Sequence, residues 1–474
     1  MRRHGGAVLL AAAVATAAAP LHADDGSGTL ESLEGGALSS DTRISVGFLY
    51  GAGGRPGGLG SRASTVGAGV AAVAGNPAGL AFLTKNGFLL DVLPPIAASV
   101  TEIADLEGAA ATMLDEAVED MASRNLEPVY PALDVSAGQQ AGIISGALAV
   151  RIGSVVAAAA IEEPVSVKLD LVETGIEAFA QAVKSEGDGD VDIELRCFAD
   201  AAAEIAFEIE KTTLALGSEI VPDVGVGLSV SRYHGRASAS AVLRADGIVS
   251  YGGQEHAFND PSDPWDNDLG LSGRGAYQGE AIGWSGGASW RARDWLTVDV
   301  VYASVPVLSM NGTLTTVENT LPAADDGGLE LDEVNAAEPT LTERTETVEH
   351  DPLIVHMPSY TGLAVSMRAW RVVATLEYRR YSGLLGFEFQ DEREGIEPTD
   401  GAGVEADFGG LRLGAGVIRG RLWNDSPGDG QGDGVLIPLA NMGFQFELGE
   451  SMTMDLLLVA VPLQVLKLSF DYSF

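Results

Sequence analysis

The chain has 474 residues and a formal net charge of −39, from 67 acidic and 28 basic side chains. Nucleic acids and anionic lipid surfaces both bind basic faces, so this charge excludes nucleic acid as a partner and a polybasic patch as a lipid anchor. A hydrophobic content of 46% excludes an acidic disordered tail, and the single cysteine, Cys197, excludes an internal disulfide.

The first residues have the pattern of a secretory signal peptide. Arg2 and Arg3 precede an apolar run from Ala7 to Ala19, which is too short to cross a bilayer. We expect cleavage after Ala23, which removes residues 1–23. No later apolar run reaches the roughly 18 residues of a transmembrane helix. An exported, apolar-rich chain without such helices spans a membrane only as a closed β-barrel, and the alternative is a soluble periplasmic β-protein.

A Gly- and Ala-rich stretch precedes the first clear strands. We assign residues 24–85 to a plug- or hatch-like segment and 86–474 to a barrel. The segment contains Gly75-Asn76-Pro77-Ala78-Gly79-Leu80-Ala81. Pro77 fixes its own φ and favours extended geometry at Asn76, whose side chain can bond nearby backbone. This predicts a rigid turn, which serves either to position a plug or simply to enter a strand. The candidate hatch or ligand-binding residues are Asn76, Pro77, Ala78 and Gly79.

Two segments have helical spacing and predict short helical inserts. Ser99 and Glu102 have capping-box spacing, and apolar residues then recur every three or four positions as far as Met121. Thr174 and Glu177 repeat the capping signal ahead of a second apolar face that ends at Val183. Neither segment is long or apolar enough to span lipid.

Strict alternation from Val191 to Ile209 predicts β-structure, because odd positions are apolar or small and even positions are largely charged. A barrel strand crosses the membrane in roughly 9–11 residues, so this span is either two strands or one strand that projects beyond the bilayer. Further alternating segments and short turns predict the strands 282–290, 296–302, 363–369, 372–381, 411–422, 442–448 and 452–458.

Long polar connections alternate with the short turns. Such asymmetry is typical of outer-membrane barrels, and about 14 strands are expected in all. The predicted long loops are Gln254–Glu280, Thr313–Pro352, Gln390–Gly403 and Asn424–Gly434.

The acidic loops contain the only candidates for a metal site. Hard cations such as Ca²⁺ prefer clustered carboxylates, but the spacing does not fit an EF-hand, so solvated loop residues are the simpler interpretation. The weak calcium candidates are Asp260, Asp263, Asp266 and Asp268. Cysteine and histidine spacing predicts no zinc site, and no nucleophile or phosphate-binding motif appears, so neither an enzyme nor a cofactor is expected.

The C-terminal residues alternate between apolar and polar side chains. Phe470, Tyr472 and Phe474 are assigned to lipid, while Lys467 and Asp471 are assigned to the lumen. By the same parity Glu377 and Arg379 face the lumen, where an ion pair that braces the barrel is the simpler alternative to a substrate site. A strand that ends on Phe474 resembles the recognition signal of outer-membrane barrels.

The element around Asn76, with Gly67-Ala68-Gly69-Val70-Ala71 before it, resembles the N-terminal signature of the FadL/TodX family of outer-membrane transporters for hydrophobic compounds. The resemblance implies a 14-stranded barrel with an N-terminal hatch, in which ligands bind inside and leave sideways into the membrane. The element also resembles that of PorV-type barrels of a secretion pathway and of conjugal-transfer-like barrels.

The sequence therefore predicts an all-β fold: an antiparallel transmembrane β-barrel of about 14 strands, located in the bacterial outer membrane. The resemblance implies passive uptake of hydrophobic small molecules such as long-chain fatty acids. The alternative is a PorV-like barrel that acts as a secretion or docking partner of other proteins. The expected partners are outer-membrane lipid and lipopolysaccharide, a hydrophobic ligand, and the barrel-assembly machinery through the C-terminal strand.

Overall fold

The structure is a computed structural model that describes residues 29–34, 37–45, 59, 63–94, 132–186, 189–251, 253–258, 270–320, 342–389, 392–424, 434–461 and 465–474. It confirms an antiparallel barrel of 14 strands. In order around the barrel these are β3 (Gly87–Leu93), β5 (Gly142–Ile152), β6 (Val155–Glu186), β7 (Gly189–Val221), β8 (Val224–Tyr251), β10 (Gly270–Arg293), β11 (Leu296–Ser304), β14 (Ser359–Ala369), β15 (Val372–Ser382), β17 (Glu392–Asp407), β18 (Leu411–Asn424), β19 (Gly434–Glu447), β20 (Met452–Val461) and β21 (Val465–Ser473).

The C-terminal strand closes the barrel. β21 pairs with β20 on one side and with β3 on the other, where Leu468 faces Val92. Along β21 the polar side chains Lys467 and Ser469 are fully buried, whereas Tyr472 and Phe474 are exposed. The alternation in the sequence thus produces one polar inner wall and one apolar outer wall.

Large apolar side chains cover the outer wall of neighbouring strands. Leu216 of β7, Leu228 of β8 and Ile282 of β10 are each more than half exposed. Thr213 and Ser231 lie on the opposite face of the same strands and are buried. An apolar exterior around a polar interior is the arrangement of a membrane-embedded barrel, because lipid contacts the outside.

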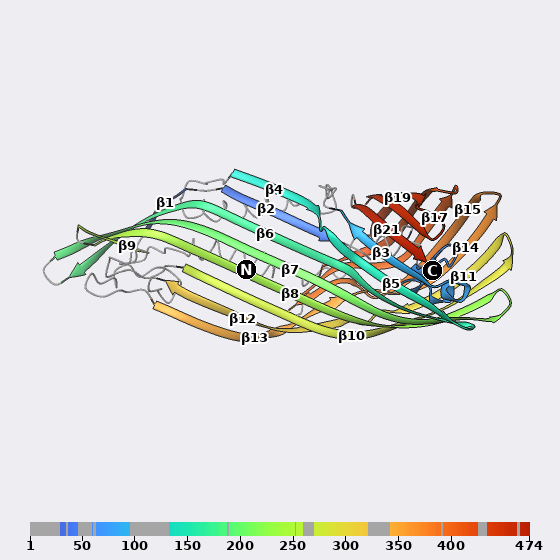
Figure 1. Ribbon diagram of the computed structural model, residues 1–474. Coiled ribbons are helices and arrows are strands. Elements are labelled where there is room, and N and C mark those ends of the chain that lie inside the picture. Colours follow the sequence, from blue (N-terminus) through green and yellow to red (C-terminus); the bar gives the residue numbers. More distant parts are fainter. Residues whose placement is uncertain are drawn as a thin grey trace.

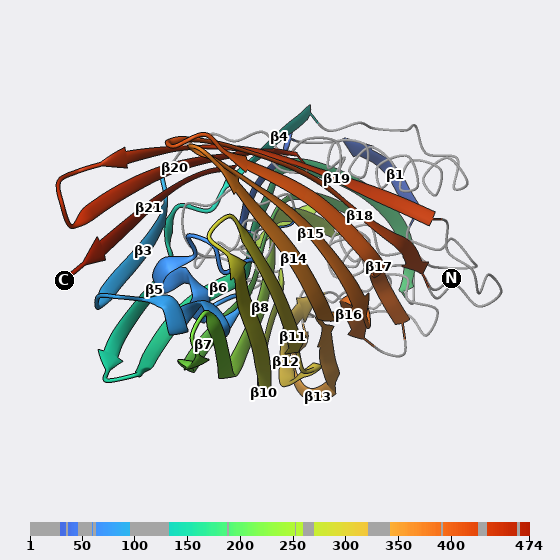
Figure 2. The same cartoon turned by 90° about the vertical axis from the view of Figure 1, so that its right-hand side faces the viewer.

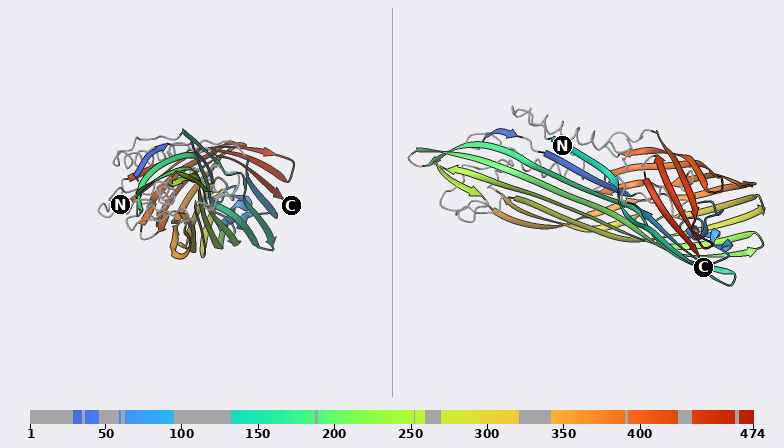
Figure 3. Two further views of the ribbon diagram at one scale, coloured as in Figure 1. Left: turned by 90° about the vertical axis from the view of Figure 1, so that its left-hand side faces the viewer. Right: turned by 45° about the horizontal axis from the view of Figure 1, so that its top comes forward.

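Four adjacent strands project far beyond the bilayer on one side of the molecule (Figure 1, Figure 3). β6, β7, β8 and β10 contain 32, 33, 28 and 24 residues. At about 3.3 Å per residue, β7 is roughly 110 Å long, whereas about 10 residues suffice to cross a membrane. The predicted strand 191–209 is therefore part of one strand that projects beyond the membrane, and not two strands.

Shorter strands complete this projection. β1 (Thr29–Glu34) and β2 (Ala37–Ser45) pair with the outer part of β6, and β4 (Ala132–Gln139) lies parallel to β2. β9 (Gln254–Phe258) pairs with β8. The remaining strands are β12 (Leu308–Thr320), β13 (Thr342–His356) and β16 (Leu385–Phe389), which continue the wall beyond β11, β14 and β15.

Two predictions of local structure are wrong. Residues 174–183, predicted as a helix, lie within β6 and pair with β7 and β1, because continuous pairing on both sides outweighs a local capping signal. The predicted loops also include residues that are strands in the structure, because β10, β12, β13 and β17 extend into the predicted loop ranges. Beyond the lipid a strand can be polar on both faces, so polarity does not mark its end.

Several predicted features lie outside the described residues. They are the signal peptide, the helix predicted from Ser99 to Met121, and the calcium candidates Asp260, Asp263, Asp266 and Asp268.

Two short 3-10 helices lie inside the barrel, next to β5–β8 (Figure 2). They are η1 (Gly69–Val73) and η2 (Pro77–Phe82). We call residues 63–83, which include both helices, the hatch. Among the described residues, no helix has the length and apolarity needed to cross a bilayer.

Candidate functional site

Asn76 begins the second helix of the hatch. Its backbone is extended, with φ −97° and ψ 104°, and its side-chain Oδ1 accepts a hydrogen bond of 3.1 Å from the backbone N–H of Ala78. Pro77 occupies the first helical position, where a missing N–H leaves no hydrogen bond unmade. The short helix therefore starts at a position that its own sequence specifies.

The amide nitrogen of Asn76 also ties the hatch to itself and to the barrel. Nδ2 donates to the carbonyl of Ala63 at 2.9 Å and to the carbonyl of Val300, in β11, at 3.2 Å. Asn76 is only 2% exposed, so losing the side chain would leave the buried carbonyl of Ala63 and the buried N–H of Ala78 without these partners. One side chain thus joins three parts of the chain.

Four glycines on the inner wall allow the second helix to lie directly against the barrel backbone. A β-carbon on Gly287 would overlap Oδ1 of Asn76, and one on Gly227 would overlap the carbonyl of Pro77. A β-carbon on Gly217 would lie 2.7 Å from Cβ of Leu80, and one on Gly225 would lie 2.9 Å from Cβ of Ala81. We call Gly217, Gly225, Gly227 and Gly287 the glycine contact surface. Nothing in the neighbouring sequence marks these glycines, so a local pattern does not predict them.

Buried polar contacts hold the segment that enters the hatch. The backbone N–H of Thr65 donates to Asp299 at 3.0 Å, and its hydroxyl donates to the same carboxylate at 2.7 Å. Ser64 shares a hydrogen bond of 3.1 Å with Ser366, and the N–H of Ala63 donates to Glu377 at 3.3 Å. Three successive hatch residues are therefore bonded to strands β11, β14 and β15.

Apolar packing holds the hatch against the opposite strands. Val70, Val73 and Leu80 are at most 2% exposed, and each contributes roughly 1.5–3 kcal/mol by burial. They pack against small side chains, which allow the helices to approach the wall. These alanines of β5, β6 and β7 are Ala147, Ala149, Ala158, Ala160 and Ala215.

The predicted lumen-facing residues lie on the inner wall beside the hatch. Arg379 forms an ion pair with Glu377, and both are buried. Lys467 is fully buried and lies 3.5 Å from Asp91. The carboxylate of Asp471 lies 3.2 Å from the position that a β-carbon on Gly69 would occupy, so it faces the first helix of the hatch.

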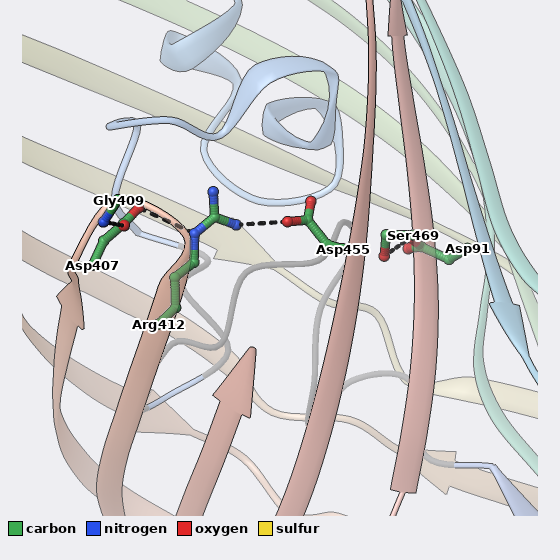
Figure 4. A network of polar contacts seen from close by, with 6 residues as sticks. All are labelled: Asp91, Asp407, Gly409, Arg412, Asp455 and Ser469. Carbon is green, nitrogen blue, oxygen red and sulfur yellow. Dashed lines mark hydrogen bonds and ion pairs between the residues drawn. The ribbon is translucent and has the colours of Figure 1, made fainter. Parts of the chain in front are cut away.

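A second set of buried charges, absent from the sequence predictions, lies on the same wall (Figure 4). Arg412 lies between Asp407 and Asp455, at 3.1 Å and 3.2 Å. Ser145 and Ser469 both donate hydrogen bonds to Asp91. These groups brace β3, β5, β18, β20 and β21 from inside, and only their parity in the sequence could have indicated them.

Above the hatch the lumen becomes apolar. The rings of Phe207 in β7 and Phe387 in β16 meet edge to face, with centroids 5.2 Å apart. Leu308 and Met310 are fully buried beside them. They lie against Gly235 of β8, where a β-carbon would come within 2.6 Å of the Met310 sulfur. The inner wall at this level is therefore apolar and aromatic.

A groove of about 570 Å³ lies in the wall between β5 and β6. The ladder between these strands ends at the pair Ser145–Glu162. Farther along, β6 pairs on this side with β2, from Ser166 onward. In the described ladder, residues 163–165 lie between the two segments of β6 that pair on this side. They form a β-bulge in the pairing of β6 with β7. This bulge contains Pro164, which has no N–H to donate.

Residues from both faces of the wall line this groove, which we call the wall groove. Leu148 and Ile161 are exposed on the outer, lipid-facing side. Ala147 and Ala160 belong to the cluster that packs against the hatch. The wall groove therefore runs from the lipid side to the wall residues directly behind the hatch.

A different cavity lies on the other side of the hatch. It has a volume of about 630 Å³ and is lined by Val66 and Gly67 of the hatch together with residues at the β7–β8, β10–β11 and β14–β15 turns. Arg291, Arg293 and Arg368 are among them, so this cavity is polar where the wall groove is apolar. Among the described residues, no group of three or more His, Cys, Asp and Glu side chains is arranged to hold a metal ion.

The inner face of the long projection is apolar. Ile193 and Val249 are fully buried there, on β7 and β8. Cys197 points to the same side of β7, and burial raises the pKa of its thiol to about 12. This thiol is held in its neutral form and is not a nucleophile at physiological pH.

Comparisons with known proteins give similarity to solved structures alone. A scan against protein-family models finds no match, and neither does a search of curated proteins. The toluene transporter TbuX of Ralstonia pickettii is 12% identical, with 90% of this chain and 99% of that chain covered and a TM-score of 0.41. A Pseudomonas aeruginosa FadL homologue is 13% identical, with 91% and 98% covered and a TM-score of 0.42.

The toluene transporter TodX of P. putida is 12% identical, with 90% and 99% covered and a TM-score of 0.38. These three are among the solved structures that the chain is similar to over most of its length. The fold itself is established by the closed strand pairing of the chain.

Proposed function

We propose that the chain is an outer-membrane transporter for passive uptake of hydrophobic small molecules. The observation that carries this proposal is the apolar wall groove, which lies at a break in the strand ladder directly behind the hatch. A hydrophobic molecule that reaches the hatch gains more by entering lipid than by entering water, since removing apolar surface from water is favourable.

The path has three parts. Cargo enters the open end of the barrel and passes the apolar cluster that contains Phe207 and Met310. The hatch blocks straight passage, because it is bonded to β11, β14 and β15 and packed on β5–β8. The cargo then leaves sideways through the wall groove. The polar cavity on the far side of the hatch offers no comparable apolar route.

The sequence resemblance adds the cargo class and the location. The element around Asn76 resembles that of transporters for hydrophobic compounds, of which long-chain fatty acids are one example. It also supports a location in the bacterial outer membrane, where the proposed barrel would contact lipopolysaccharide. The terminal strand, whose Phe474 N–H donates to Asn86 at 3.0 Å, is the proposed contact of the barrel-assembly machinery.

Uptake by whole cells tests the function. Cells that lack their own transporters of this kind, with and without this protein, are given a labelled uncharged compound such as methyl dodecanoate. We expect a several-fold higher initial rate with the protein. Equal rates would overturn the transport proposal and favour the docking alternative. Heat-modifiable gel mobility confirms in the same cells that the barrel is folded.

A further inference from the structure

The acidic residues at the wall groove narrow the class of cargo. Four of the residues that line the groove carry a carboxylate: Glu162, Glu163, Glu208 and Glu210. Lys211 forms an ion pair with Glu162, with Nζ and Oε2 2.7 Å apart, so this cation is already neutralised. The groove combines an apolar floor with four carboxylates. The nearest further cations are Arg236 of β8, which lies opposite Glu208, and Arg232 of β8, which is already paired with Glu280.

The position of these carboxylates matters as much as their number. Along the outer face of β7, Leu216 and Leu214 are exposed to lipid, and Thr212, Glu210 and Glu208 follow on the same face. Glu163 of β6 lies close enough to Glu208 and Glu210 for mutual repulsion. Cargo that leaves the barrel through the groove must therefore pass the acidic end of an otherwise apolar surface.

The inner wall carries an excess of the same sign. Among the described residues, the buried charged side chains are six carboxylates and four cations: Asp91, Glu162, Asp299, Glu377, Glu405 and Asp455 against Lys211, Arg379, Arg412 and Lys467. An anion inside the barrel meets net repulsion, which a medium of low polarity strengthens. Without Glu162 and Lys211, which belong to the groove, five buried carboxylates and three buried cations remain, so the inner wall has the same consequence on its own.

We infer that the transporter selects uncharged hydrophobic molecules and rejects ionised ones such as fatty-acid carboxylates. The inference rests on the proposed function and names its cargo class. An ester or hydrocarbon lies on the floor formed by Leu148, Ala159 and Ile161 without an electrostatic penalty. A carboxylate of the same chain length is repelled by Glu163, Glu208 and Glu210, which act as a charge filter.

A matched pair of compounds tests this directly. Methyl dodecanoate and dodecanoate have the same chain, and at about pH 8 only the second is ionised. We expect the protein to raise ester uptake several-fold and to leave dodecanoate uptake within about twofold of cells without it. Equal stimulation of both compounds would overturn the inference and leave the transport function standing, whereas no stimulation of either would overturn transport itself.

The triple variant Glu163→Gln, Glu208→Gln, Glu210→Gln identifies the residues responsible. It should raise dodecanoate uptake several-fold over that of the unaltered protein, so that the ratio of dodecanoate to ester uptake rises, and no rise in this ratio would overturn the assignment to these carboxylates. The matched control is Asp192→Asn, Glu194→Gln, Glu204→Gln, which removes three exposed carboxylates from the outer face of β7 away from the groove. A control variant that admits dodecanoate equally well would show that overall charge decides, and would overturn the assignment to the groove.

Discussion

The side-chain oxygen of Asn76 occupies the space that a β-carbon on Gly287 would need. The two residues are more than 200 positions apart, and their contact brings the start of a hatch helix against the backbone of β10. Close packing of this kind leaves no empty volume for an added group, because protein interiors are packed at crystal-like density. The position of the hatch is therefore sensitive to a single methyl group added at Gly287.

Gly287→Ala is predicted to displace the hatch without unfolding the barrel. The added methyl overlaps Asn76, while the β10 ladder on either side is unaffected. We expect normal heat-modifiable mobility and a severalfold higher single-channel conductance in planar bilayers. Gly273→Ala is the control on the same strand and face, since its nearest neighbour is 4.0 Å away. Unchanged conductance in Gly287→Ala would show that the added methyl group does not displace the hatch.

Asn76→Ala is predicted to loosen the hatch selectively. The carbonyls of Ala63 and Val300 lose their donor and the N–H of Ala78 loses its acceptor, at about 1–3 kcal/mol for each group left buried. Backbone hydrogen exchange in residues 63–83 should become at least tenfold faster, with barrel strands unchanged. Asn86→Ala, which removes an exposed hydrogen bond to Arg151, should not change the hatch. Exchange that rises equally throughout would indicate global destabilisation instead.

Thr65→Val tests the bond between the hatch and Asp299. Valine keeps the shape of the side chain but removes the hydroxyl that donates to the buried carboxylate at 2.7 Å. Hydrogen bonds to charged groups contribute about 1.5–3 kcal/mol, so the free energy of hatch opening should fall by that amount. Hydrogen exchange of residues 63–83 measures it, and Thr65→Ser should restore most of the loss. If Thr65→Ser behaves like Thr65→Val, the hydroxyl bond is not the cause.

The thiol of Cys197 is predicted to resist alkylation. Because burial raises its pKa to about 12, the thiolate fraction near neutral pH is roughly a thousandfold below that of an ordinary cysteine. Iodoacetamide should label the folded barrel very slowly at about pH 8 and label the urea-unfolded chain readily. Labelling at equal rates in the two states would contradict the buried position of this thiol.

The same shift fixes the sign of a pH effect on stability. The folded state holds the Cys197 thiol neutral, whereas the unfolded chain releases its proton more easily. The contribution is therefore fully present below the pKa of an unfolded thiol, about 8.5, and decreases as the pH rises toward the folded value. Cys197→Ser should remove this alkaline decrease, and a decrease of the same size in Cys197→Ser would assign it to other groups.

Alternation in the sequence was sufficient to predict the strands that span the membrane. Leu466–Phe474 lies between lipid and a polar lumen, and β21 follows that parity. Val191–Ile209 alternates as well, but it lies in the projection, where the apolar residues of β7 face inward. Outside the lipid the outer face is polar, so polarity no longer separates strand from loop, and residues 254–280 are predicted as a loop although β9 and the first part of β10 lie there. The helix predicted at 174–183 had correct local spacing, but β1 and β7 on either side made it a strand.

The site depended on contacts that no local pattern encodes. The bond from Asn76 to Ala78 is local, and the sequence suggested it. The glycine contact surface and the bond from Thr65 to Asp299 join residues more than 130 positions apart, so only the closed barrel reveals them. Pro164 marks an irregular position in β6, but the groove beside it exists because β5 ends its pairing at the same level.

Blocking the wall groove tests lateral passage most directly. Ile161 lines the groove and is 57% exposed, and Leu228, on the lipid face of β8 outside the groove, is 67% exposed. Ile161→Trp is predicted to lower methyl dodecanoate uptake to the level of cells without the protein, while Leu228→Trp leaves it unchanged and both barrels fold. Uptake by Ile161→Trp at the unaltered rate would contradict exit through the groove.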